Sequence, residues 1–278
     1  VNNKMNKNEI EKIEIDILLG TLNKMHGYNF SGYAKASLKR RVRKTAKEFN
    51  LESISEMIPK VIHDNNFLNK LLFNFSITVS EMFRDPPFFK SLRETVIPFL
   101  KTYPYIKIWH AGCATGEEVY SMAILLQEEG LYDKCTIFAT DFNNSALAQA
   151  KEGIYDIKQI KEFTENYQMS GGKSSFSDYY ITNNNYAKMN KSLRDKVTFA
   201  NHNLVTDGVF SERHLILCRN VLIYFGSDLQ NRVLNVFTES LVNKGFLAIG
   251  SKESIEYSSV KDKYKAINKK LRIFRKKI

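Results

Sequence analysis

The stretch Tyr105-Ile-Lys-Ile-Trp-His-Ala-Gly-Cys-Ala-Thr-Gly-Glu-Glu118 indicates the fold of most of this 278-residue chain. Its short, mostly apolar run Ile106–Trp109 predicts a buried strand, and the glycines that follow predict a tight turn into a helix. In a doubly wound sheet such a turn lies at the carboxyl end of the strand, where glycines let a ligand approach the backbone. The spacing of Gly112 and Gly116 differs from that of dinucleotide dehydrogenases, which disfavours hydride chemistry. The alternative is a turn without a ligand, whose two glutamates merely favour the helix N-terminus.

The same strand–turn–helix pattern repeats toward the C-terminus. Strands are predicted at 136–140, 197–200, 215–218 and 246–249, and helices at 119–130, 145–151 and 229–241. This alternation is typical of the α/β class with a mostly parallel, doubly wound sheet. Leu271 and Ile273 alternate with the basic residues between and after them, as expected of an exposed edge strand. Residues 155–195 interrupt the pattern and predict a small inserted β-subdomain or loop.

Helices are predicted in residues 8–85, because the apolar residues there recur at helical spacing. Two apolar stripes comprise Ile10, Ile13, Ile17, Leu18, Leu22 and Met25, then Leu38, Val42 and Phe49. Asp85 before Pro86 predicts an N-cap that opens a connecting helix through about Leu100. We therefore expect a helical domain at 1–85, a connecting helix and linker at 86–104, and a second domain at 105–278.

The net charge of +11 is concentrated at the two ends of the chain. Residues 1–50 carry 11 basic and 5 acidic side chains, and residues 251–278 carry 10 and 3, which leaves the middle slightly acidic. This distribution disfavours a uniformly basic polyanion binder. Residues 35–47 alone hold seven basic side chains and no acid. A solvated face, phosphate binding and docking of an acidic partner are all compatible with that run.

The composition excludes several classes of protein. A hydrophobic content of 43% is enough for a core, which argues against disorder. The three cysteines lack metal-ligand spacing and cannot all pair, as expected in a reducing cytoplasm. No apolar run approaches a membrane span, and the polar N-terminus lacks a secretory pattern. We therefore expect a cytoplasmic protein with no metal and no direct membrane insertion.

Asp141 ends the strand that follows the glycine turn, 25 residues after Gly116. A carboxylate at this place can accept hydrogen bonds from both hydroxyls of a ribose. An N-cap for the next helix is the common alternative. Together with the glycine turn, the acid favours nucleoside binding.

Two further motifs combine an apolar run with polar residues. Leu215-Ile-Leu-Cys-Arg-Asn-Val-Leu-Ile-Tyr-Phe225 is a buried strand that ends in Arg219-Asn220, and a following helical turn would place Asn220 and Tyr224 on one face. A salt-bridged loop with a core tyrosine is the alternative. Thr78-Val-Ser-Glu-Met-Phe-Arg84 sets Ser80 and Arg84 four residues apart, and a guanidinium suits a carboxylate. A surface arginine on an interdomain helix is the alternative there.

In this order, and with His-Asn-Leu at 202–204, the motifs resemble the CheR-type chemotaxis receptor methyltransferases over about residues 10–275. The resemblance implies a Rossmann-like methyltransferase sheet, an N-terminal helical domain and an inserted β-subdomain. It also implies methyl transfer from S-adenosyl-L-methionine to glutamate side chains of receptor signalling domains, which leaves S-adenosyl-L-homocysteine. By matching positions, the implied cofactor residues are Thr78, Ser80, Arg84, Glu118, Asp141, Asn203, Leu204, Arg219 and Asn220.

The resemblance places Arg84 and Tyr224 closest to the incoming glutamate, as the catalytic residues. It also favours docking of an acidic receptor on the basic helix, through Arg40, Arg41 and Arg43. A glutamate is already an anion at pH 7, so the transfer needs alignment rather than a general base.

Two other functions are disfavoured. Nucleic-acid methyltransferases of exocyclic amines use a proline-containing loop where Arg219–Leu222 stands, and no proline follows residue 104. A cytosine-C5 enzyme would need a proline next to its cysteine, which this sequence lacks. A scaffold that only senses the methyl donor would not need Arg84, Asn220 and Tyr224.

Overall fold

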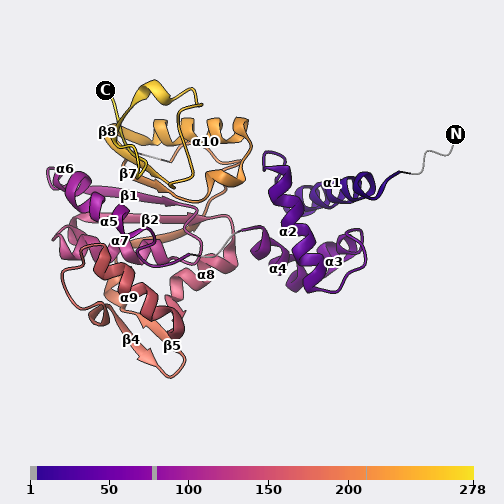
Figure 1. Cartoon of the computed structure of the whole chain (residues 1–278), viewed down its shortest axis with the longest axis horizontal. Helices are drawn as coiled ribbons and strands as arrows, with labels where there is room; N and C mark the ends of the chain where they lie inside the picture. Colours follow the sequence, from indigo (N-terminus) through magenta and orange to yellow (C-terminus); the bar gives the residue numbers. More distant parts are fainter. Residues whose placement is uncertain (1–4, 77–79, 211) are drawn as a thin grey trace. The chain divides into compact units, whose positions relative to one another are not determined.

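The computed structural model describes residues 5–76, 80–210 and 212–278 (Figure 1). Contacts within the chain divide it into two compact units. The first comprises residues 1–77 and 224–229, and the second comprises residues 78–223 and 230–278. The segment just before Pro86 thus groups with the second unit, whereas the domain limits at 85 and 104 stay predictions.

The first unit is helical. Its elements are α1 (Lys7–His26), α2 (Lys35–Glu48), α3 (Met57–His63) and α4 (Asn65–Phe75). A capping box starts α1, in which the Asn6 side chain accepts from the backbone of Glu9 and the Glu9 carboxylate accepts from Asn6. Gly27, with a φ of 75°, ends α1 in the left-handed conformation that favours glycine.

Only part of the predicted apolar stripe of α1 is buried. Leu18 and Leu22 are fully buried, but the stripe members Ile10, Ile13, Ile17 and Met25 are 48%, 45%, 51% and 55% exposed. A helix that packs through one face buries only the residues on that face, and here it is the face of Ile15, Leu18 and Leu22. The predicted helix is therefore present, but only part of its apolar stripe is buried. Phe49, 37% exposed, lies just beyond α2.

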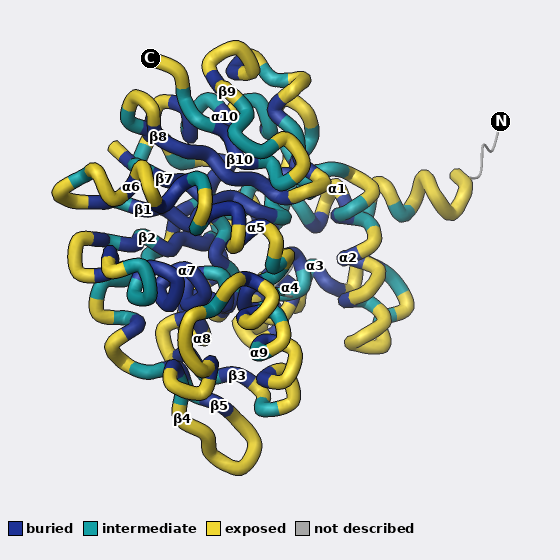
Figure 2. The backbone as a smooth tube through the Cα atoms, turned by 60° about the vertical axis from the view of Figure 1, so that its left-hand side comes forward, coloured by how far each residue is buried: buried dark blue, intermediate teal, exposed yellow. Residues whose placement is uncertain are grey.

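The second unit contains, within the described residues, a seven-stranded sheet in the order β6-β2-β1-β7-β8-β10-β9. Its strands are β1 (Ile106–Ala111), β2 (Cys135–Asp141), β6 (Val197–Asn201), β7 (Arg213–Cys218), β8 (Leu241–Ile249), β9 (Tyr264–Asn268) and β10 (Ile273–Lys276). The first five are parallel, and β10 is antiparallel to both of its neighbours. Figure 1 shows β1, β2, β7 and β8 side by side, and Figure 2 shows that the middle of this sheet is buried.

The helices of this unit follow the predicted alternation with the strands. They are α5 (Pro86–Ser91), α6 (Ile97–Leu100), α7 (Glu117–Glu128), α8 (Asn144–Glu152), α9 (Ile160–Met169) and α10 (Ser227–Ser240). A π-helical turn, Leu92–Val96, joins α5 to α6, so the predicted connecting helix through Leu100 is present.

The predicted edge strand is not at the edge. β10 lies between β8 and β9, with Ile273 and Phe274 buried, and the edge is β9, which the sequence pattern did not reveal. Alternation of basic and apolar side chains indicates that one face of a strand is exposed. It does not show whether the hydrogen-bonding edge of the strand is paired, and here β9 pairs with that edge of β10.

The predicted β-subdomain is present between β2 and β6. In the described chain it is a three-stranded antiparallel sheet of β3 (Ile154–Asp156), β5 (Tyr186–Met189) and β4 (Tyr180–Asn183), accompanied by α9. The Tyr155 hydroxyl donates to the Thr115 carbonyl oxygen at 2.8 Å. The subdomain therefore supports the glycine turn directly. Figure 2 shows the β4–β5 hairpin as an exposed tip.

Candidate active site

The glycine turn after β1 is closely packed at the carboxyl edge of the sheet. The backbone amides of Gly112 and Cys113 both donate to the Thr140 carbonyl oxygen, at 2.8 and 2.9 Å. Gly112 has a φ of 80°, and a Cβ there would lie 2.6 Å from Cγ2 of Val221. Gly116 has a φ of 93°, and its Cβ would lie 2.9 Å from Cβ of Ala150. Both conformation and space therefore require glycine at these two positions.

Asp141 lies beside this turn, at the end of β2. Its Oδ2 accepts from the Ala114 amide at 3.0 Å, and its Oδ1 accepts from the Asn143 amide at 2.9 Å. Burial raises the pKa of Asp141, although these backbone hydrogen bonds oppose the shift. The N-cap of α8 is Asn143, which accepts from the Ser145 and Ala146 amides, so Asp141 does not have that alternative role. The Phe142 amide is a third backbone donor to this carboxylate. A carboxylate has about four acceptor sites, so the three hydrogen bonds leave about one for a ligand.

Arg219, just beyond β7, links two acids. Its Nη1 lies 2.8 Å from Oε2 of Glu118, and its Nη2 lies 2.6 Å from Oδ2 of Asp85. The guanidinium also lies over the Phe88 ring, 3.9 Å from the centroid. These contacts hold the Arg219 side chain, which is only 3% exposed. The sequence predicted Arg219 and Glu118 separately, and the structure brings them together.

Glu118 is held as an anion by its neighbours. Its Oε1 lies 3.1 Å from Nδ1 of the buried His110. Burial alone would raise the pKa of Glu118, but Arg219 and His110 outweigh it and lower the pKa to about 2. Glu118 therefore carries its charge throughout the physiological range.

Asp85 stands at the predicted N-cap position of α5, before Pro86, but its side chain does not cap the helix. It has a φ of 59° and makes no side-chain capping hydrogen bond, because its carboxylate pairs with Arg219 instead. Phe83 also has a positive φ, of 52°. The segment 80–85 is therefore not helical, and the predicted four-residue pairing of Ser80 with Arg84 on one face is wrong. Positive φ at two non-glycine residues stores strain of the kind found at functional sites.

Glu117 is a buried acid that the sequence analysis treated only as a helix former. The Thr115 hydroxyl donates to its two oxygens at 2.8 and 2.7 Å, and Ser80 also hydrogen-bonds to it. Burial raises the pKa of Glu117 to about 7, against the effect of these hydrogen bonds. Ser80 is thereby positioned at the start of α7. Thr78, the other cofactor residue predicted in this motif, lies outside the described residues.

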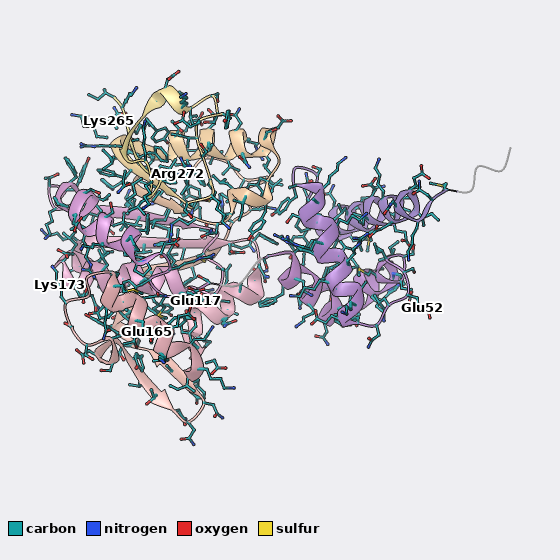
Figure 3. All side chains as sticks on the ribbon, in the orientation of Figure 1. Glu52, Glu117, Glu165, Lys173, Lys265 and Arg272 are labelled. Carbon is teal, nitrogen blue, oxygen red and sulfur yellow. The ribbon has the colours of Figure 1, made fainter. Side chains whose placement is uncertain are left out.

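We expect Glu117→Gln to stabilise the protein increasingly as the pH rises from about 4.5 to about 7. A raised pKa in the folded state favours folding below the unfolded pKa, and this advantage is lost as the pH rises through the folded value. The amide keeps the shape without the cost of ionisation, so the difference reaches up to about 3 kcal/mol. Urea unfolding between pH 5 and 8 measures it. Glu165→Gln, at an exposed site on α9 (Figure 3), is the control, and equal pH profiles for both variants would contradict the assignment.

The remaining predicted residues lie in the loops after β6 and β7. The His202 amide donates to the Asp141 carbonyl oxygen at 3.1 Å, which brings Asn203 and the buried Leu204 to the same edge of the sheet. The Asn203 side chain closes a local turn by accepting from the Val205 amide at 3.0 Å. Asn220 has a φ of 61°, so it is not helical and does not share a helical face with Tyr224.

Glu253, after β8, is a site residue that sequence reasoning missed. Its carboxylate accepts from the Asn220 and Ile223 amides, each at 3.2 Å, and so shapes the turn after β7. Only 4% of Glu253 is exposed, and burial raises its pKa. The available signal was an acid in a basic tail, shortly after an apolar strand. Asp141, in contrast, is the last residue of its strand.

The two predicted catalytic residues belong to different units. Arg84 lies in the second unit, where its carbonyl oxygen accepts from Arg219 at 3.4 Å. Tyr224 groups with the first unit, where the guanidinium of Arg41 lies 4.3 Å from its ring centroid. Their joint action on a substrate stays a prediction.

Arg41 is not a surface residue of the basic helix. It is 4% exposed, and its Nη1 donates to the Phe75 carbonyl oxygen inside the first unit. Arg43 pairs with Glu11 through Nη2 and Oε2 at 2.8 Å, whereas Arg40 is exposed. A docking surface on this helix would therefore use Arg40 and its exposed neighbours, with Arg41 as an internal support.

The described residues contain no group of three or more His, Cys, Asp or Glu side chains that could hold a metal ion. Over the same ranges no helix is both long and apolar enough to cross a membrane.

Comparison with known families identifies the class. The model described as CheR methyltransferase, SAM binding domain, matches residues 78–273, so the sheet is that of an S-adenosylmethionine-dependent methyltransferase. The model described as CheR methyltransferase, all-alpha domain, matches residues 13–75. The chain belongs to the CheR methyltransferase family.

Curated relatives match over most of their own length. The Pseudomonas putida protein Cher3 is 49% identical over 95% of this chain and 97% of its own. A chemotaxis protein methyltransferase of Listeria monocytogenes is 29% identical over 82% of this chain and 85% of its own. Chemotaxis protein methyltransferase 1 of Vibrio cholerae is 29% identical over 82% and 83%.

The residues at the carboxyl edge fit S-adenosylmethionine. Asp141 keeps an acceptor site beyond its three backbone hydrogen bonds, which suits a ribose hydroxyl. In the turn beside it, Gly112 and Gly116 carry no side chain where the backbone approaches Val221 and Ala150. The ionised Glu118 suits a positively charged group of the ligand.

Proposed function

We propose that this protein transfers the methyl group of S-adenosylmethionine to glutamate carboxylates of chemoreceptor signalling domains and forms methyl esters. Family membership and the chemotaxis names of its relatives support the proposal. The structural observation that carries it is the cluster at the carboxyl edge, where Asp141 flanks the glycine turn and Arg219 holds an ionised Glu118. When bound, S-adenosylmethionine supplies an electrophilic methyl group on a sulfonium.

The side chains of this chain then have only to align the partners. Asp141 would accept from a ribose hydroxyl, and Glu118, ionised well below pH 7, would hold a cationic part of the ligand. Arg84 and Tyr224 would orient the glutamate, whose carboxylate needs no general base at neutral pH. Positioning alone supplies a large part of such a rate acceleration.

The direct test is incubation with methyl-labelled S-adenosylmethionine and purified receptor signalling domains. A methyl ester is hydrolysed by base, so the label should be released as methanol after mild alkali. Label that resists alkali would show transfer to nitrogen, and label that never reaches the receptor would remove the proposed substrate.

Arg84→Lys should slow turnover at saturating S-adenosylmethionine by at least about tenfold, because a point ammonium cannot reproduce the planar guanidinium. Within the described residues, the Arg84 side chain forms no ion pair, so its guanidinium is available to a substrate. Turnover and the thermal unfolding midpoint are the measurements, with Arg232→Lys at an exposed site as the control. Equal turnover in both variants would leave Arg84 with no part in orienting the glutamate.

The exposed basic residues of α2 should act on receptor encounter. Changing Arg40, Lys44 and Lys47 to Glu should raise KM for the receptor and slow association, with cofactor affinity unchanged. The difference should shrink as salt rises, because exposed charges are screened over about 10 Å at 0.1 M. Lys265, Lys269 and Lys270, changed together to Glu in the second unit, make the same charge change elsewhere. If both triple variants show the same KM, the α2 charges are only a solvated face.

A further inference from the structure

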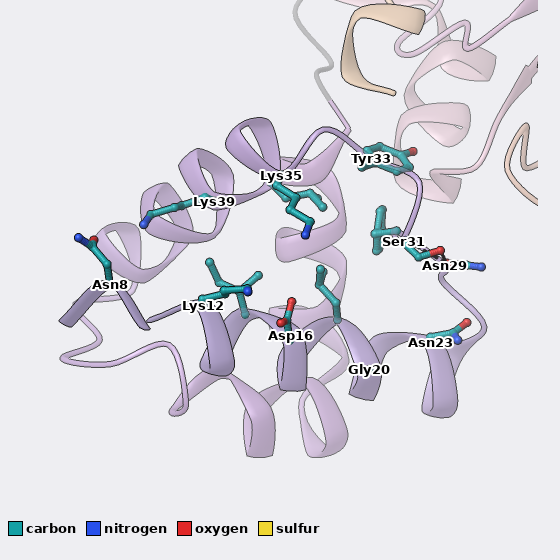
Figure 4. Close-up of a pocket in the computed structure, with 14 residues that line it drawn as sticks. Asn8, Lys12, Asp16, Gly20, Asn23, Asn29, Ser31, Tyr33, Lys35 and Lys39 are labelled. Atoms are coloured by element: carbon teal, nitrogen blue, oxygen red, sulfur yellow. Dashed lines mark hydrogen bonds between the residues drawn. The ribbon is translucent and has the colours of Figure 1, made fainter. Parts of the chain in front are cut away.

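A groove lies in the first unit between α1, the 29–33 loop and the start of α2 (Figure 4). Its volume is about 560 Å³, and every residue that lines it belongs to this unit. Ile15, Leu19, Phe30 and Leu38 supply apolar walls. Pockets of small organic ligands have volumes of about 300–1,000 Å³ and similarly apolar linings. The groove is separate from the carboxyl-edge site of the second unit.

Gly20 lies in this lining, in the second half of α1. A glycine inside a helix costs about 1 kcal/mol relative to alanine. Gly20 has no positive φ, and a Cβ built there would meet nothing within 4 Å. Neither backbone conformation nor packing within the described chain therefore requires glycine, and the absence of a side chain leaves this wall of the groove open.

The charges of the lining are mostly positive. Lys12, Lys35 and Lys39 face a single acid, Asp16. Lys39 is paired with Glu11 at 2.6 Å, whereas the described residues record no ion pair for Lys12 or Lys35. Figure 4 shows Lys35 extending from α2 toward α1 across the groove. Two lysines are therefore available at an apolar cavity.

We propose that this groove binds an amphipathic organic carboxylate. Its charged head would lie at Lys12 and Lys35, and its apolar body would lie along Ile15, Leu19 and the open wall at Gly20. A small inorganic anion would leave the apolar walls in water, and an apolar cation would meet two uncompensated lysines. The inference does not depend on the proposed methyl transfer, since the groove and the carboxyl-edge site have no residue in common.

The test is calorimetric titration of the full chain with decanoate, for which we expect saturable binding at one site. Lys12→Gln combined with Lys35→Gln should weaken it at least tenfold, while Lys24→Gln, on α1 but outside the groove lining, should not. Gly20→Trp should abolish binding by filling the groove, whereas Gly20→Ala should keep it and raise the thermal midpoint. Decyltrimethylammonium and inorganic phosphate should bind much more weakly.

Three results would overturn the proposal: no saturable binding of decanoate, equal binding by the double lysine variant, or equal binding of the cationic probe. If Gly20→Trp fails to fold, the lysine pair and its Lys24→Gln control still decide the question. Methyl transfer is measured separately, so loss of one activity does not imply loss of the other.

Discussion

Arg219→Met is expected to abolish methyl transfer and to destabilise the second unit by about 3–5 kcal/mol at pH 7, because it leaves a buried acid without its partner. The Glu118 side chain is only 19% exposed and would keep the His110 ring as its polar neighbour. Asp85 would lose the contact that replaces its capping role. Because Asp85 adjoins Arg84, the segment proposed to orient the substrate would lose its attachment to β7.

The pH dependence of this loss follows from Glu118. Its folded pKa of about 2 lies below the ordinary value of 4.5, so its contribution to stability is present above about pH 4.5 and is lost as the pH falls toward 2. In Arg219→Met the contribution is absent, and burial raises the pKa of Glu118 instead. The difference between variant and wild type should therefore be largest at neutral pH and smaller at pH 4.

Urea unfolding at pH 7 and pH 4 and a turnover assay measure both effects. Arg232→Met is the control, because Arg232 is exposed and donates to the backbone carbonyl oxygens of Thr206 and Asp207. Wild-type stability of Arg219→Met at pH 7 would show that the linked acids are adequately solvated without the guanidinium.

Asp141→Ala is expected to lower the affinity for S-adenosyl-L-homocysteine by a factor of ten or more. A ribose hydroxyl would lose a charged acceptor, and such a hydrogen bond contributes about 1.5–3 kcal/mol. The Ala114 amide of the glycine turn would lose its acceptor as well, so the turn itself would be less well held. Calorimetry with S-adenosyl-L-homocysteine measures the change.

Asp133→Ala is the matched control, because Asp133 is exposed just before the amino end of the same strand. It should bind the ligand like the wild type. An Asp141→Ala protein that is folded, by its thermal midpoint, yet binds with unchanged affinity would remove Asp141 from the cofactor site.

Local patterns predicted a large part of the fold. The five parallel strands and the helices between them follow from short apolar runs, glycines and helical spacing, all of which act over a few residues. The glycine turn and Asp141 could be predicted for the same reason, because both follow directly from the end of a strand. Glu253 lies four residues beyond the end of β8, and its role depends on the Asn220 and Ile223 amides about 30 residues away.

The sequence by itself determined the alternation of strands and helices, the glycine turn and the acid at the end of β2, because spacing and backbone conformation are local properties. Only the tertiary structure decided which face of α1 is buried, that Arg41 is internal, and that Asp85 pairs with Arg219 rather than capping α5. Periodicity shows which side chains share a face, but not which face meets a neighbour. An ion pair between residues more than 130 positions apart forms only when the folded chain brings the two side chains together.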